Sequence, residues 1–264
     1  MMNNILFLNK NGNKAPIKIL IGSLLKNNIY WPFTTVSLAN NQNADDLQHA
    51  LSDNYIGSNH YISDEGYVFN PSTYVLSDIF LNVPDDNFDG QHFLSECLKS
   101  QFIVGLPYLL EPKVFFAISV SNYKYLSRDG GYLICVSECE QRISYNDILR
   151  VRIHERLDLL FINGEHSGFI LKDPFRSLVR FSGFDEEKHG GDKEIDLCLF
   201  NKAFFSYFDM MESESWDNID NNDINIRNGL LNILESLEGA DKSKEPIFAL
   251  QEQCQRLLSD YYSC

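Results

Sequence analysis

The sequence lacks any apolar stretch approaching the roughly 20 residues that a helix needs to cross a bilayer. Its N-terminal apolar stretch, residues 5–8, is too short for the hydrophobic region of a secretory signal, and no small-residue cleavage site follows. We therefore expect a cytoplasmic protein that has no membrane partner.

Cofactor and nucleophile motifs are also missing. The chain contains no GxGxxG, GxxxxGK[ST] or GxSxG sequence. These motifs cradle phosphates or present a nucleophilic serine, so we expect no nucleotide cofactor held in the usual way and no serine elbow. No cofactor of any other kind is predicted.

Six cysteines are scattered along the chain, several of them in apolar surroundings. In a chain of 264 residues this pattern is typical of reduced, partly buried thiols rather than of a disulfide framework. On a strand, Cys135 and Cys139 would lie about 13 Å apart, too far to chelate one zinc ion by themselves. No metal site is predicted.

Acidic residues are absent from positions 1–44, which carry four lysines, and they dominate the remainder. The net charge is −15 for the whole chain and −19 for residues 45–264. Such a body repels phosphates, and no basic stripe with interleaved aromatics is present, so no nucleic acid partner is expected. The charge either serves solubility alone or attracts a basic partner and speeds that encounter.

Strand-like runs joined by short turns fill most of the chain, with little helix between them. Hairpins are predicted over 5–22, 60–70 and 157–172, the last around Asn163–Gly164. A strand, a turn and a strand are predicted over 113–122, 123–131 and 132–139, with Asp129–Gly130–Gly131 as the hinge. Further strands are predicted over 33–38, 74–83, 148–155, 175–184 and 194–200, and helices over 43–53 and 86–102. In the strand 148–155, Arg150, Arg152 and His154 alternate onto an exposed cationic face.

The last part of the chain has helical spacing instead. Helices are predicted over 201–211, 224–238 and 247–262, with Asp223 capping the second and Pro246 opening the third. The predicted fold is α+β: a large, mostly antiparallel sheet of hairpins and meander with a helical C-terminal layer. We expect a β-rich body over 1–210 and a helical segment over 211–264, packed together in one domain.

An acidic run stands in the connection that leads into these helices. Glu212, Glu214, Asp217 and Asp220 surround Trp216, with no lysine or arginine between them. The run does not fit the EF-hand ligand pattern in either workable frame. We interpret it as a candidate docking loop, with Trp216 either an interface anchor or packed back on the sheet.

A second acidic group offers the alternative of catalysis. On the predicted strand 194–200, Asp192, Glu194 and Asp196 alternate onto one face, with His189 just before them. Paired carboxylates of this kind clamp the divalent metals of phosphoryl and nucleotidyl transfer. The pattern is similar to the paired acids of the nucleotidyltransferase fold, although Gly190–Gly191 stands too close to Glu194 for that family's intervening helix. These acids would otherwise form the solvated face of an edge strand.

A third set of residues is similar to the acid–acid–lysine trio of restriction-type nucleases. It consists of Asp158, Glu165 and Lys172. In those nucleases one residue separates the second acid from the lysine, whereas six do so here, and the acidic body disfavours DNA as a substrate.

Together these features favour a non-catalytic, cytoplasmic binding protein that docks a basic protein partner through its acidic surface. An immunity or inhibitor protein that neutralises a basic toxin is one concrete form of this hypothesis. The alternative is a metal-dependent phosphoryl- or nucleotidyl-transfer enzyme that uses Asp192, Glu194, Asp196 and His189.

Overall fold

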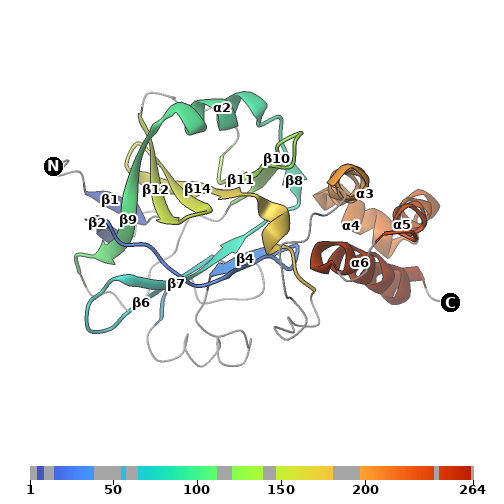
Figure 1. The fold of residues 1–264 in the computed structure, drawn as a ribbon, viewed down its shortest axis with the longest axis horizontal. Helices are drawn as coiled ribbons and strands as arrows, with labels where there is room; N and C mark the ends of the chain where they lie inside the picture. The colour runs from blue at the N-terminus through green and yellow to red at the C-terminus, as the bar shows by residue number, and fades with distance from the viewer. Residues whose placement is uncertain are drawn as a thin grey trace. The chain divides into compact units, whose positions relative to one another are not determined.

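The chain groups into two compact units in a computed structural model (Figure 1). The structure describes residues 5–8, 15–38, 55–57, 65–111, 121–138, 147–180, 197–240 and 244–262. The first unit comprises residues 1–84 and 88–174, and the second comprises residues 85–87 and 175–264. That the β-rich and helical parts form a single domain stays a prediction.

The first unit contains a large mixed sheet. Its strands run in the order β1-β2-β9-β12-β13-β14-β11-β10, and β1 also pairs with β14. The first six strands in that order therefore close into a barrel-like ring. The pairs β1–β14 and β9–β12 are parallel and the others are antiparallel. The bounds are β1 Leu6–Leu8, β2 Ala15–Ile21, β9 Gln101–Leu109, β10 Tyr123–Leu126, β11 Tyr132–Val136, β12 Ile148–His154, β13 Leu157–Ile162 and β14 Glu165–Lys172.

A second, fully antiparallel sheet lies in the same unit, in the order β3-β4-β7-β6-β5. Its strands are β3 Ile29–Tyr30, β4 Thr35–Leu38, β5 Tyr55–Gly57, β6 Gly66–Phe69 and β7 Leu76–Asn82. The strands predicted over 33–38 and 74–83 are confirmed. The α+β class is also confirmed, but the predicted antiparallel meander matches only in part because the large sheet is mixed.

Helix α2 (Gln91–Lys99) covers one face of the large sheet, and β4, β6 and β7 lie on the other side of it (Figure 1). The α2 face buries Phe93, Leu94, Cys97, Ile134, Val136, Ile148, Leu160, Ile162 and Ile170. Strand β13 is buried at every position. A sheet covered on both faces explains why β13 is buried at successive positions and is apolar at all of them except Asp158.

The β13–β14 hairpin forms where the sequence predicts it. Asn163 and Gly164 both adopt positive φ angles, 52° and 80°, which is the backbone that a two-residue hairpin turn requires. The hairpin places Leu159 opposite Phe169, both with 0% exposure.

The second unit is helical, apart from β8 (Asp86–Asn87) in its short segment 85–87. Phe175, Phe200 and Phe204 form its aromatic core, with ring centroids 4.9 to 5.8 Å apart. Its helices are the 3-10 turn η3 Pro174–Ser177, α3 Leu197–Met210, α4 Ser213–Asp220, α5 Ile224–Ser236 and α6 Glu245–Tyr262, with η3 beginning one residue before the unit.

Two strand predictions in this unit are wrong. Residues 175–177 belong to η3, and no strand forms over the described residues that follow it, 178–180. Residues 197–200 open α3, whose buried Phe200, Phe204 and Phe208 recur every four residues. A short apolar run alone cannot distinguish a strand from a helix. Here the four-residue spacing of the buried phenylalanines, seen over the whole of α3, identifies the helix.

The ends of the C-terminal helices agree with the sequence. The Asp223 carboxylate accepts a hydrogen bond of 2.6 Å from the Asn225 N–H and caps α5 as predicted. Pro246 lies in the first turn of α6. The helix predicted over 43–53, and residues 113–120 of the strand predicted over 113–122, lie outside the described residues.

Cys97, Cys135 and Cys254 are buried free thiols, as expected from their apolar surroundings. In the portion of the chain that the structure describes, no helix combines the length and the apolar character that crossing a membrane requires.

Candidate functional site

The predicted docking residues lie in the helical unit, on and beside α4. Glu212 is exposed just before the helix, and Asp220 is exposed at its last position. Trp216 is half-buried. Glu214 and Asp217 are part of α4, but their side chains lie outside what the structure describes.

The segment is a helix rather than the expected loop. Met211 and Ile219 are buried, 4% and 0% exposed, and Ser215 lies between them at the same four-residue spacing. The Ser215 hydroxyl donates to the Met210 carbonyl at 2.6 Å, which fastens α4 to the end of α3. Asn87 donates to the Glu212 carboxylate at 2.8 Å, so that side chain is exposed but oriented.

Negative charge is concentrated in this unit. Residues 85–87 and 175–264 contain 20 Asp and Glu but only nine Lys and Arg, a net charge of −11 of the chain's −15. The first unit, almost twice as long, carries only −4.

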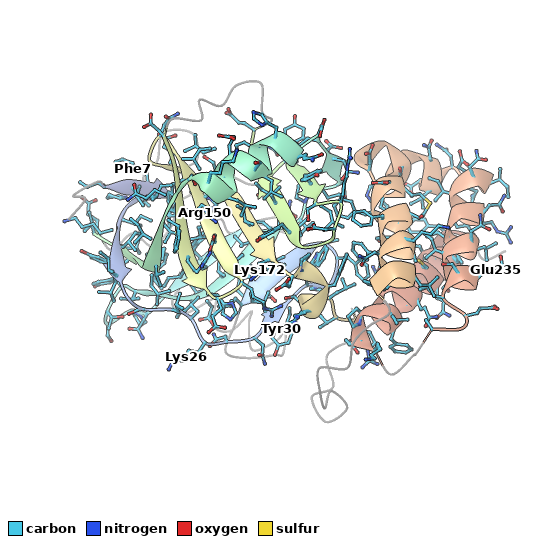
Figure 2. All side chains as sticks on the ribbon, turned by 45° about the horizontal axis from the view of Figure 1, so that its top comes forward. Phe7, Lys26, Tyr30, Arg150, Lys172 and Glu235 are labelled. Carbon is cyan, nitrogen blue, oxygen red and sulfur yellow. The ribbon has the colours of Figure 1, made fainter. Side chains whose placement is uncertain are left out.

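The exposed residues of the helical unit have the same bias. Six described acids are exposed, and Figure 2 labels one of them, Glu235 on α5. The exposed cations described in the unit are Arg176, Lys202 and Arg227. Arg180 is half-buried: its guanidinium pairs with the Glu245 carboxylate at 3.1 Å and stacks on the Phe248 ring. The six exposed acids are Asp209, Glu212, Asp220, Glu235, Glu238 and Asp260.

The alternative catalytic group, Asp192, Glu194, Asp196 and His189, lies outside the described residues. Its role therefore stays a prediction. Within the ranges that the structure describes, no three His, Cys, Asp or Glu side chains gather in a way that would hold a metal ion.

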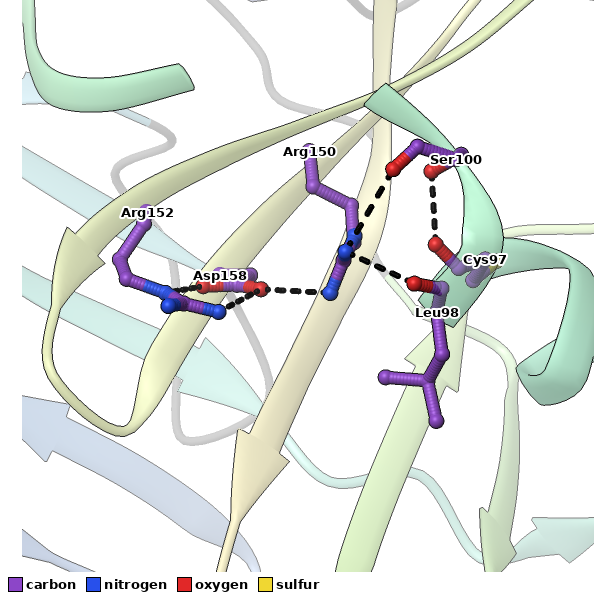
Figure 3. A network of polar contacts seen from close by, with 6 residues as sticks. All are labelled: Cys97, Leu98, Ser100, Arg150, Arg152 and Asp158. Atoms are coloured by element: carbon purple, nitrogen blue, oxygen red, sulfur yellow. Dashed lines mark hydrogen bonds and ion pairs between the residues drawn. The ribbon is translucent and has the colours of Figure 1, made fainter. Parts of the chain in front are cut away.

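The nuclease-like trio is not assembled as a site. Asp158 is buried and binds two arginines of β12: its carboxylate meets Arg150 at 3.2 Å and Arg152 at 2.8 Å (Figure 3). Glu165 and Lys172 stand at opposite ends of β14.

The predicted cationic face of β12 is also corrected. Arg150 is buried, with 5% exposure, rather than exposed. Its guanidinium donates to the Leu98 carbonyl at 3.0 Å, at the C-terminal end of α2, where a cation satisfies carbonyls that lack helical partners (Figure 3). The exposed ring of Phe102 lies 5.4 Å from the Arg150 guanidinium and 4.8 Å from that of Arg152. This network ties α2 to the sheet, which is a structural role.

A second buried polar group lies between the two sheets of the first unit, and the sequence analysis missed it. Glu65, which directly precedes β6, has 0% exposure, and its Oε1 accepts from the Ser121 N–H at 3.1 Å and the Ser121 hydroxyl at 2.8 Å. Tyr67 and His166, also buried, share a hydrogen bond of 2.7 Å. Glu65 lies in the middle of the hairpin predicted over 60–70, and nothing in the neighbouring sequence indicates its burial.

Burial controls the titration of this group. It raises the pKa of Glu65 from 4.5 to about 8, although the Ser121 hydrogen bonds act in the opposite direction. It lowers the pKa of His166 from 6.5 to about 3 and raises the pKa of the Cys135 thiol well above its usual value. Both Glu65 and His166 are therefore neutral at pH 7, and Cys135 is not a thiolate nucleophile.

Comparison of the chain with protein-family models, curated proteins and solved structures found no match. Function is therefore inferred from the side chains of this chain alone.

Proposed function

We propose that the protein is a non-catalytic binding protein that docks a basic protein partner through the acidic surface of its helical unit. An inhibitor or immunity protein, which covers the cationic active site of a toxin with carboxylates, is the concrete form that we favour. The observation that carries the proposal is the concentration of charge: −11 of −15 lies in the helical unit.

The described part of the helical unit is suited to this role because its exposed acids stand on packed helices. Phe204 and Leu230 have 0% exposure and form part of a packed interior beneath the exposed carboxylates. Asp223 fixes the start of α5, and Glu212 is held by Asn87. Carboxylates held in place lose little conformational freedom when a partner binds, and opposite charge accelerates the encounter.

Trp216 gives the surface an apolar element. It is half-buried on α4, between Glu214 and Asp217 in the sequence. Aromatic residues surrounded by charged neighbours are frequent anchors of protein interfaces. We assign Trp216 this role within the proposed docking surface.

The test is affinity capture with the full-length chain as bait, from extracts of the cells that produce it. One variant neutralises the docking residues: Glu212→Gln, Glu214→Gln, Asp217→Asn and Asp220→Asn. A matched control neutralises four exposed acids of the first unit, Asp89, Glu111, Glu138 and Glu155, and so has the same net charge.

We expect the wild type and the control to enrich the same basic protein and the docking variant to lose it. Equal capture by all three baits would show that the acids around α4 do not form the interface. Failure of the wild type to enrich any basic protein would contradict the proposed function itself.

A further inference from the structure

The segment that enters β10 is held to the second sheet by hydrogen bonds that converge on one residue. Ser121 donates its N–H and its hydroxyl to the Glu65 carboxyl, and its carbonyl accepts from Asn82 of β7 at 3.3 Å. Ser121 and Glu65 are 2% and 0% exposed. Among the hydrogen bonds described for Ser121, a single carboxyl group therefore accepts two.

The residue that carries this carboxyl is fully buried, with 0% exposure, beside a buried aromatic cluster. β6 is buried along its whole length, and Tyr67 on it contacts the His166 ring on β14, with centroids 5.4 Å apart. The Phe161 ring also packs edge-to-face on the His166 ring, with centroids 5.7 Å apart. A carboxylate is far more costly to bury than a carboxylic acid, so Glu65 keeps its proton while the contact is closed.

We propose that the Glu65 carboxyl is a proton-dependent clamp between β6 and the start of β10, closed while it carries its proton and released when the proton leaves to water. In the open form the carboxylate is solvated, and Ser121 exchanges its bonds to Glu65 for bonds to water. The clamp belongs to the first unit and is independent of the proposed docking surface. It makes the packing of the two sheets sensitive to pH.

The titratable groups that face this space come from four strands. Among the described residues they are Tyr67 on β6, Lys124 on β10, Cys135 on β11 and His166 on β14. Lys124 is buried; it lowers the pKa of the neighbouring Cys135 thiol, whereas an ionised Glu65 raises it. Tyr67 and Cys135 have raised pKa values and stay neutral near pH 7.

The direction of the pH effect follows from the pKa values of Glu65 and His166, which burial shifts in opposite directions. The solvated Glu65 of the open form titrates near 4.5 and that of the closed form near 8, so opening releases a proton between these values. His166 acts in the opposite direction, but only below its ordinary value of 6.5. Between pH 6.5 and 8 the opposing contribution of His166 fades, and Glu65 dominates the pH dependence.

The test is hydrogen–deuterium exchange of the full-length protein between pH 6.5 and 8, corrected for the intrinsic pH dependence of amide exchange. We expect the opening constant of the amides of Tyr67 and Ser121 to rise by up to about tenfold per pH unit in the wild type. In Glu65→Gln, which keeps the shape and has no proton to lose, it should not change with pH. Amides of β12 and β13 serve as the reference for global unfolding.

A pH-independent opening constant in the wild type would overturn the proposal, even if Glu65→Gln failed to fold. The same slope in Glu65→Gln would also overturn it, because the titrating group would be another one. If the Tyr67 and Ser121 amides had the same opening free energy as the β12 and β13 amides at every pH, they would exchange only through global unfolding, and the clamp would not exist as a local element. The slope does not decide this, because global unfolding also exposes Glu65.

Discussion

Replacing Glu65 with glutamine should stabilise the protein at neutral pH, because it removes an acid that the fold keeps protonated. Burial raises the pKa of Glu65 from 4.5 to about 8. The unfolded chain releases this proton near pH 4.5, so between pH 4.5 and 8 the folded state holds one proton more. The stability that the neutral carboxyl contributes is complete below pH 4.5 and is lost as the pH rises towards 8.

The size of the effect at pH 7 follows from these values. The loss spans about 2.5 pH units, and at about 1.4 kcal/mol per unit it amounts to roughly 3 kcal/mol. A glutamine at this position keeps the Oε1 acceptor for both Ser121 donors and adds no charge. Glu65→Gln should therefore raise the free energy of unfolding by up to roughly 3 kcal/mol at pH 7, but by less than about 1 kcal/mol at pH 5.

Urea denaturation at pH 5, 6, 7 and 8 measures this difference directly. Glu155→Gln, at an exposed position of the same unit, is the matched control and should leave the free energy of unfolding nearly unchanged at each pH. Suppose that the difference in free energy of unfolding between the wild type and Glu65→Gln stayed constant from pH 5 to pH 8. This would refute the reasoning, because an acid whose pKa is raised by folding makes the stability of the wild type fall with pH.

Three further substitutions test other parts of the fold, each by denaturant unfolding. Asp158→Asn should cost about 3–5 kcal/mol because it leaves Arg150 buried without its counter-charge, and a loss under 1 kcal/mol would contradict the account of the network. Gly168→Ala should destabilise strongly, since φ is 144° and a Cβ would collide with the Cys135 carbonyl oxygen; wild-type stability would exclude that geometry. Asp223→Ala should cost about 1 kcal/mol through loss of the α5 cap, and Asp223→Asn should restore most of it.

The features that could be predicted from the sequence are those that neighbouring residues determine. The Asn163–Gly164 turn needs only two residues with positive φ, and the Asp223 cap needs only a carboxylate just before a helix. The apolar spacing of 86–102 likewise located α2, although residues from 101 onwards form β9 instead.

The features that were missed depend on contacts between distant parts of the chain. The parallel pairing of β9 with β12 joins residues nearly fifty positions apart, and a barrel-like closure follows from it and from β1 with β14. Arg150 alternates with apolar residues like a solvent-facing cation, and only Asp158 and the end of α2 explain its burial. Glu65 has the local sequence of a turn, and only Ser121, 56 residues later, reveals its environment.

For the docking residues, the sequence shows the acidic charge and the aromatic residue, and the structure shows the conformation that carries them. The acidic run and Trp216 are visible in the sequence, whereas the helical conformation of α4 is not, because Asn and Asp disfavour helices and Met211 and Ile219 must be buried to compensate. The division of charge between the two units became apparent only when the fold grouped residues 85–87 with 175–264.

The central claim is that this helical unit attracts a basic partner electrostatically. Its most direct test is the association rate constant of the captured partner, measured at low and high salt against three forms of the chain. The forms are the wild type, the variant neutralised at Glu212, Glu214, Asp217 and Asp220, and the first-unit control of equal net charge. We predict that the wild type and the control lose about tenfold or more in rate between 0.05 and 0.5 M salt, while the docking variant starts lower and changes less. Identical rates and salt slopes for the docking variant and the control would contradict the account.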